Sequence, residues 1–184
     1  AGRPHYLAQA GSPRGAALLA ALPSEPADEQ LERQAATELA GAADSMGRTL
    51  DAAAPAAAAQ HPDHPHYDDI ASRCLACTNC TLVCPTCFCG GAVDTTDLTG
   101  EIAERWWQWD SCFSEEFSLM HGGPVRASTK ARYRQWLLHK LVTWDQQFGT
   151  PGCVGCGRCI AWCPAGIDLT VEIAALAEEP GGTP

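Results

Sequence analysis

The chain has 184 residues, of which 46% are hydrophobic, and it carries a net charge of −10 at pH 7. This length suits one ordinary domain, or one domain with a tail. The acidic balance argues against nucleic acid as the main partner, and no apolar run is long enough to cross a bilayer. The chain begins at Ala1 with neither an initiator methionine nor a signal peptide, so we expect a processed or incomplete chain.

The first 66 residues are expected to form an N-terminal tail, a helix and a linker. Residues 1–26 mix Gly, Pro, Ala and Ser without periodicity, which is typical of a loop. From Ala27, an apolar stripe that includes Leu31 and Leu39 predicts a helix. The alanine- and proline-rich segment that follows is typical of a linker, and its three histidines at 61, 64 and 66 are spaced irregularly by prolines. We therefore prefer a solvated linker to a metal site there.

Residues 67–178 carry two cysteine runs with the same spacing, C-x2-C-x2-C-x3-C-P. The first is RCLACTNCTLVCPTCFC at 73–89, and the second is CVGCGRCIAWCP at 153–164. This spacing is typical of bacterial cubane iron–sulfur sites, in which the fourth cysteine of each run binds the other cluster. Zinc and disulfides fit less well, because four such close thiols are too crowded for one zinc ion and eleven cysteines is an odd number. The spacing predicts two [4Fe-4S] clusters.

The predicted ligands exchange between the two runs, because the turn after the third cysteine directs the fourth away from the first three. Pro85 and Pro164 stop each run from continuing as a helix. The first cluster is assigned to Cys74, Cys77, Cys80 and Cys163. The second is assigned to Cys153, Cys156, Cys159 and Cys84. Such an exchange would hold the two halves of the domain together.

A long insert at residues 85–152 separates the runs. Its basic segment from Arg126 to Lys140 has apolar residues at helical spacing, with Ser128 as an N-cap and Gly149 beyond the end. The tryptophans of the insert are expected to pack in the core. A basic row on the helix is either simply solvated, or docks an acidic partner, or stabilises a reduced cluster; its members are Arg126, Lys130, Arg132 and Arg134.

Three further cysteines, Cys87, Cys89 and Cys112, lie in the insert. They are either buried small side chains or ligands of a third [4Fe-4S] cluster. A third cluster needs one more ligand, for which His139 on the expected helix is the better candidate and His121 the second.

These segments together resemble a known family. The segments are the first cysteine run, WDSC at 109–112, HGGPVR at 121–126, LLHK at 137–140 and PGCVGCGRCIAWCPAGID at 151–168. Together they look like the 4Fe-4S dicluster subunits, called beta subunits, of soluble NAD(P)-linked nickel–iron sulfhydrogenases. The A subunit of anaerobic sulfite reductase is similar in the same places. The resemblance implies a mostly α fold with irregular cluster-binding loops. In this fold, residues 67–178 form an α-helical ferredoxin-like dicluster domain, and residues 179–184 form a short C-terminal tail. It also favours Cys112 and His139 over His121 as third-cluster ligands.

In function, the resemblance implies an iron–sulfur subunit that relays electrons between a flavin-containing NAD(P)H subunit and a catalytic metal subunit. A soluble nickel–iron hydrogenase is the first choice of complex. The alternatives are an electron-transfer subunit of anaerobic sulfite reductase and a structural or assembly module. We expect no catalytic residues, because the chain shows no nucleophile–base arrangement, phosphate loop or dinucleotide fingerprint. Thiolate-ligated clusters of low potential indicate a reducing cytoplasm.

Overall fold

A computed structural model describes residues 6–180 of the chain. These residues fall into two units, one that ends at Thr49 and one that begins at Leu50, and each is described by itself. Residues 1–5 of the expected N-terminal tail and 181–184 of the expected C-terminal tail lie outside the described range. Within residues 6–180, no helix has the length and apolar character that a membrane span requires.

The first unit contains two helices, α1 at Pro13–Ala20 and α2 at Glu29–Asp44. Helix α2 confirms the helix expected from residue 27, and the Asp28 carboxylate caps it. Helix α1 lies where a loop was expected, because the Ser12 cap followed by Pro13 is a helix start signal that the loop-like composition concealed. Within these two ranges no side chain is buried.

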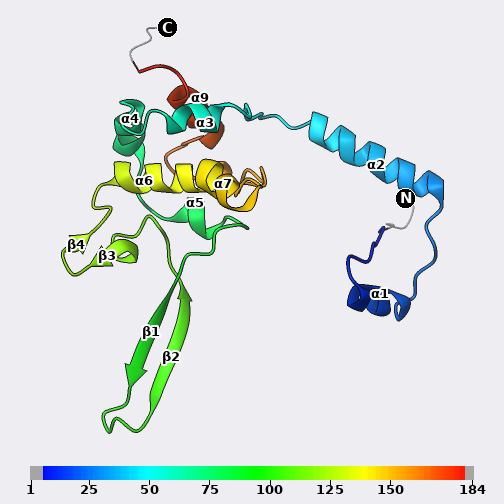
Figure 1. The fold of residues 1–184 in the computed structure, drawn as a ribbon, viewed down its shortest axis with the longest axis horizontal. Helices are drawn as coiled ribbons and strands as arrows, with labels where there is room; N and C mark the ends of the chain where they lie inside the picture. The colour runs from blue at the N-terminus through cyan, green and yellow to red at the C-terminus, as the bar shows by residue number, and fades with distance from the viewer. Residues whose placement is uncertain (1–5, 181–184) are drawn as a thin grey trace. The chain divides into compact units, whose positions relative to one another are not determined.

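The second unit is built mainly from helices, which lie close together in Figure 1. They are α3 (Ala54–Ala59), α4 (His66–Arg73), α5 (Asn79–Leu82), α6 (Thr129–Leu138), α7 (Trp144–Phe148), α8 (Arg158–Ala161) and α9 (Leu169–Leu176). A 3-10 turn, Glu116–Ser118, and a π-helical segment, His139–Thr143, complete the set. The mostly α class is therefore confirmed for this unit.

The core of the second unit lies where α6 packs against α4 and α3 packs against α9. Its buried apolar side chains are Ala54, Ala58, Tyr67, Ile70, Phe113, Tyr133, Trp136, Leu137, Leu141, Ile167, Leu169, Ile173 and Leu176. Cysteines from both runs and from the insert are partly buried against it: Cys74, Cys80, Cys112, Cys153, Cys159 and Cys163. The helical core thus forms one wall of the cysteine-rich region.

Helix α3 corrects the expectation of a solvated linker at this place. It begins at Ala54 with Pro55 in its first turn, where proline is tolerated because the first helical amides have no internal partner. Ala54 and Ala58 lie one turn apart and are buried, so one face of small side chains packs closely on α9 and the π-helical segment. The low-complexity composition concealed this apolar stripe.

The insert ends in one nearly continuous helical stretch formed by α6, the π-helical segment and α7. The Ser128 hydroxyl accepts a hydrogen bond from the amide of Ala131, as expected for an N-cap, and Gly149 ends the stretch with φ of 68°. The π-helical segment at His139–Thr143 was not expected. Such segments add a residue to a helical turn and are frequent at functional sites.

The remainder of the insert forms two antiparallel hairpins. Strands β1 (Gly90–Thr96) and β2 (Ala103–Trp109) pair from Gly90↔Trp109 to Thr96↔Ala103, and this hairpin extends away from the helices in Figure 1. Strands β3 (Leu119–Met120) and β4 (Gly123–Pro124) form a much shorter pair. The long hairpin was not expected, although the three tryptophans of β2 are of a residue type that is enriched in strands.

The tryptophans differ from expectation on the hairpin. Trp136 of α6 is buried, whereas Trp106, Trp107 and Trp109 of β2 are 57%, 71% and 68% exposed. The expectation that the tryptophans pack in the core is thus confirmed for Trp136 of α6 and wrong for the three tryptophans of β2. The reason is that no layer of the described chain covers this two-stranded ribbon.

The basic row of α6 is bound to the acidic segment before and within α4. The Lys130 ammonium lies 2.8 Å from a carboxylate oxygen of Asp68, and Arg134 lies 2.8 Å from a carboxylate oxygen of Asp63. Arg132 is buried and donates to the carbonyl of Ala127. These two ion pairs and the hydrogen bond of Arg132 give three of the four basic residues an internal role, which the sequence of α6 alone could not reveal.

Candidate metal centres

The two cysteine runs adopt the same local backbone. Ala76 and Thr78 in the first loop have φ of 49° and 69°, and Gly155 and Gly157 in the second have φ of 66° and 70°. Each loop then enters a short helix, α5 or α8. Left-handed residues at these two positions curl the chain between successive cysteines, which costs little for glycine and more for alanine and threonine. The repeated spacing therefore specifies a repeated loop.

The first cysteine group brings together Cys74, Cys77, Cys80 and Cys163, which line one cavity on the core. Burial raises the pKa of Cys80 to about 12, and the nearby Cys74 sulfur adds to this effect. Backbone amides donate to two of the sulfurs, from Ala76 to Cys74 at 3.5 Å and from Ile167 to Cys163 at 3.4 Å. Cys163 thus lies with the first run although it belongs to the second.

The second cysteine group comprises Cys153, Cys156 and Cys159, together with Cys84 of the first run. Burial raises the pKa of Cys159 to about 11, and the charges of the other three sulfurs act on it. This placement agrees with the expected exchange of the fourth cysteines, and the two sets of ligands remain predictions. Cys159 also lines the cavity of the first group, so the two groups are adjacent.

A third group forms around a cavity of about 370 Å³. Cys87, Cys89, Cys112 and His139 all line it, together with Arg126 and Lys140. The amide of Asp110 donates to the carbonyl of Cys89 at 3.0 Å, which closes the base of the long hairpin and returns Cys112 to the first run. His121, by contrast, is exposed in the turn between β3 and β4 and is not among the lining residues.

The thiols of this region form hydrogen-bonded pairs. A hydrogen bond from Cys112 lowers the pKa of Cys89 to about 6, and the pKa of Cys112 is raised in turn. A hydrogen bond from Cys87 lowers the pKa of Cys84 to about 4, so Cys84 and Cys87 connect the second group to the third. Burial lowers the pKa of His139, which favours the neutral imidazole that binds metals.

The donor sets fit iron–sulfur clusters. Cubane clusters are held by thiolates, and the first two groups each supply four cysteines and a partly buried setting. The third group supplies three cysteines and one imidazole. Because partial burial raises the pKa of several of these thiols, Cys80 and Cys159 among them, metal binding must release protons.

Lys140, which the sequence did not single out as a site residue, lies between the second and third groups. Its ammonium donates to the Cys84 sulfur at 3.2 Å, to the Thr86 hydroxyl at 3.0 Å and to the carbonyl of Gly152 at 3.1 Å. Burial lowers the pKa of Lys140, but the Cys87 and Cys84 sulfurs outweigh this effect and the net shift is upward. The lysine is therefore charged where it contacts Cys84.

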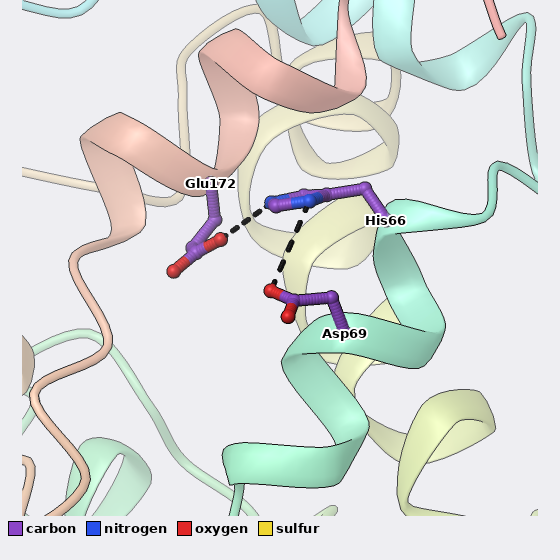
Figure 2. Close-up of side chains that lie close together, drawn as sticks. All are labelled: His66, Asp69 and Glu172. Carbon is purple, nitrogen blue, oxygen red and sulfur yellow. Dashed lines mark hydrogen bonds and ion pairs between the residues drawn. The ribbon is translucent and has the colours of Figure 1, made fainter. Parts of the chain in front are cut away.

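A separate ionic network joins α4 to α9. Figure 2 shows the side chains of His66, Asp69 and Glu172 directed toward one another. His66 Nε2 lies 2.6 Å from a Glu172 oxygen. The Arg73 guanidinium donates to both Asp69 and Glu172, at 2.7 and 3.0 Å. An arginine already supplies the positive charge between these carboxylates, so the arrangement is an ion-pair network rather than a metal centre. Because Arg73 directly precedes Cys74, it orients the start of the first cysteine loop.

His66 was expected in a solvated linker, and the structure corrects this by placing it at the start of α4 in contact with buried Glu172. One feature of the sequence could have predicted this network: Glu172 is the single acid in the apolar sequence LTVEIAAL of α9, and buried carboxylates require partners.

Replacing Glu172 with glutamine is expected to lower the free energy of unfolding by about 1–3 kcal/mol, because Arg73 and His66 lose a buried charged acceptor. The measurement is anaerobic urea unfolding of the cluster-loaded chain. Glu178→Gln, at an exposed position just beyond α9, is the matched control and should leave the unfolding midpoint unchanged. Equal midpoints for both variants would contradict a stabilising role for the network.

Comparisons with known proteins bear on the same residues. A family model described as a 4Fe-4S dicluster domain matches residues 73–167. A stretch of 99 residues is 42% identical to sulfhydrogenase 2 subunit beta of Pyrococcus furiosus. This stretch makes up 53% of the chain and 29% of that relative, so the chain spans less than a third of the relative's length. No solved structure matches the chain significantly.

Proposed function

The chain belongs to the 4Fe-4S dicluster domain family, and on that premise we propose that it is an electron-transfer subunit of a cytoplasmic nickel–iron hydrogenase complex. It relays single electrons between a flavin-containing NAD(P)H subunit and a catalytic metal subunit. The name of the P. furiosus relative, a subunit of a sulfhydrogenase, supports a redox complex of several subunits.

The observation that carries this proposal is the adjacency of the cysteine groups. Cys159 belongs to the second group and lines the cavity of the first, while Cys84 of the second group lines a further cavity together with Cys87 and Cys89 of the third. Three centres at these places form a continuous series through the second unit. A metal site that only stabilises the fold does not require a series of adjacent centres.

The chain contributes to electron transfer by holding and tuning the centres. Bound [4Fe-4S] clusters supply one-electron chemistry, and their potentials depend on hydrogen bonds to sulfur, on nearby charge and on solvent exposure. The amides of Ala76 and Ile167 donate to cysteine sulfur, and the apolar core excludes water from one side. No residue of this scheme needs to bind a substrate.

We propose further that Cys87, Cys89, Cys112 and His139 hold a third [4Fe-4S] cluster, because the four side chains share one cavity. The expected result for anaerobically purified protein is about twelve irons and twelve labile sulfides per chain, falling to about eight in Cys112→Ala. The measurement is iron and sulfide analysis with EPR of the dithionite-reduced state. About eight irons in both proteins would make the three cysteines structural.

Reduction kinetics distinguish an electron carrier from a structural module. An electron carrier is reduced rapidly by a low-potential donor and reoxidised by an acceptor without losing iron. If reduction is slow or absent while the iron content is complete, the clusters serve assembly or structure instead.

A further inference from the structure

Lys140 is a buried cation whose charge is not balanced by a carboxylate. Its residue exposure is 6%, and within residues 6–180 it forms no ion pair with an acidic side chain. Its three acceptors are the Cys84 sulfur, the Thr86 hydroxyl and the Gly152 carbonyl. A buried ammonium is costly unless negative charge compensates it, and the sulfur of Cys84 is the group in contact that can carry such charge.

Hydrogen bonds fix both the backbone and the side-chain ammonium of Lys140. Lys140 lies in the π-helical segment, and its backbone carbonyl accepts a hydrogen bond from the amide of Gly152 at 2.9 Å. A Cβ atom on Gly152 would lie 2.9 Å from that same carbonyl oxygen, so a larger residue there would push the two segments apart. The ammonium is therefore fixed between Cys84 of the first run and Gly152, which directly precedes Cys153 of the second.

The first cysteine group has no equivalent cation in contact. Backbone amides of Ala76 and Ile167 donate to Cys74 and Cys163, and no lysine or arginine side chain among the described residues donates to a sulfur of this group. Arg132 acts on Cys74 only through its charge at longer range. The two groups, although alike in sequence and loop geometry, thus differ in their donors: neutral backbone amides contact the sulfurs of the first group, and a charged ammonium contacts a sulfur of the second.

We propose that Lys140 sets the order of reduction potentials in this chain, by stabilising the added electron on the centre of Cys84, Cys153, Cys156 and Cys159. This inference rests on the proposed electron-transfer function. A positive charge and an N–H donor beside a cluster sulfur both favour the more negative, reduced state, which raises the potential. The second centre therefore accepts an electron before the first centre does.

The first test replaces Lys140 with methionine, which removes the charge and keeps an unbranched side chain. In a redox titration of the loaded chain followed by EPR, the signal of the second centre is expected to shift to lower potential by at least the equivalent of a tenfold change in its equilibrium, about 59 mV for one electron, while the signal of the first centre stays in place. The control is Lys130→Met, at the other lysine of the chain, which pairs with Asp68 on the surface and should leave every potential unchanged. Unchanged potentials in Lys140→Met, or an equal shift of all signals, would overturn the proposal.

A second test does not depend on the stability of a Lys140 variant. Cys77 and Cys156 are the second cysteines of their runs and both are exposed, so Cys77→Ser and Cys156→Ser form a matched pair. Any signal lost in Cys112→Ala is first assigned to the third centre. Of the remaining two signals, the one with the higher potential is expected to change in Cys156→Ser and the lower one in Cys77→Ser. The reverse assignment would overturn the proposal.

The outcomes also separate this inference from the proposed function. Clusters that cannot be reduced and reoxidised would contradict electron transfer itself. Clusters that cycle normally, but with the first centre at the higher potential, would contradict only the role of Lys140.

Discussion

Replacing Cys159 with serine is expected to remove about four irons per chain and to stop electron flow through the assembled complex. The reason is that Cys159 lies among Cys153, Cys156 and Cys84 and also forms part of the wall of the first group. A serine hydroxyl ionises far less readily than a thiol, so it is a poor replacement for a thiolate ligand. The measurement is iron content, EPR and NAD(P)H-linked turnover of the reconstituted complex.

The matched control for this prediction is Ala161→Ser, which adds a hydroxyl to the same short helix at an exposed position and removes no thiol. It should retain full iron content and turnover. The half-reactions of the partner subunits, measured with artificial donors and acceptors, should survive in both variants. Full turnover in Cys159→Ser would mean that electrons do not pass through the second centre.

Truncating Trp136 to alanine is expected to lower the free energy of unfolding by about 3–5 kcal/mol, the usual cost of removing a large aromatic side chain from a core. Trp136 is 5% exposed, and its ring centroid lies 5.4 Å from that of Tyr133 and 5.8 Å from that of Phe113. It also lines the cavities of the first and third cysteine groups, so its loss would admit water beside both. Anaerobic urea unfolding followed by circular dichroism measures the effect.

Trp106→Ala provides the control for aromatic truncation, because Trp106 lies on the long hairpin and is 57% exposed. Its expected cost is below about 0.5 kcal/mol. If Trp106→Ala destabilised the chain as much as Trp136→Ala, the hairpin would be packed in solution and the division between buried and exposed tryptophans would be wrong.

The placement of Lys140 changes how the two cysteine runs are understood. From their sequences they are near duplicates, and the left-handed residues at Ala76, Thr78, Gly155 and Gly157 show that their loops are alike as well. The ammonium that contacts Cys84 makes the two sites electrostatically different. Equal motifs can therefore hold centres of unequal potential when a single neighbouring side chain differs.

Short-range patterns in the sequence were reliable guides to local structure. The expected N-cap Ser128 lies where helix α6 begins, and Gly149 lies where the stretch of α6 and α7 ends. The helix expected from Ala27 begins at Glu29 as α2. The exceptions are α3 and α1, whose alanine-rich or mixed composition concealed them, and the long hairpin. Hydrophobic patterning correctly predicted that Trp136 is buried, but it could not show that Trp106, Trp107 and Trp109 are left uncovered by the rest of residues 6–180.

The sequence by itself determined the class of chemistry, because cysteine spacing within each run is a local property that specifies a cluster-binding loop. It also nominated Cys87, Cys89, Cys112 and His139 as one group, and only the tertiary structure placed them around one cavity. The positions of Lys140 beside Cys84, and of Glu172 beside Arg73 and His66, were decided by helix packing. Such contacts join residues 56 to 106 positions apart, and no periodicity within one segment encodes which distant segment will lie beside it.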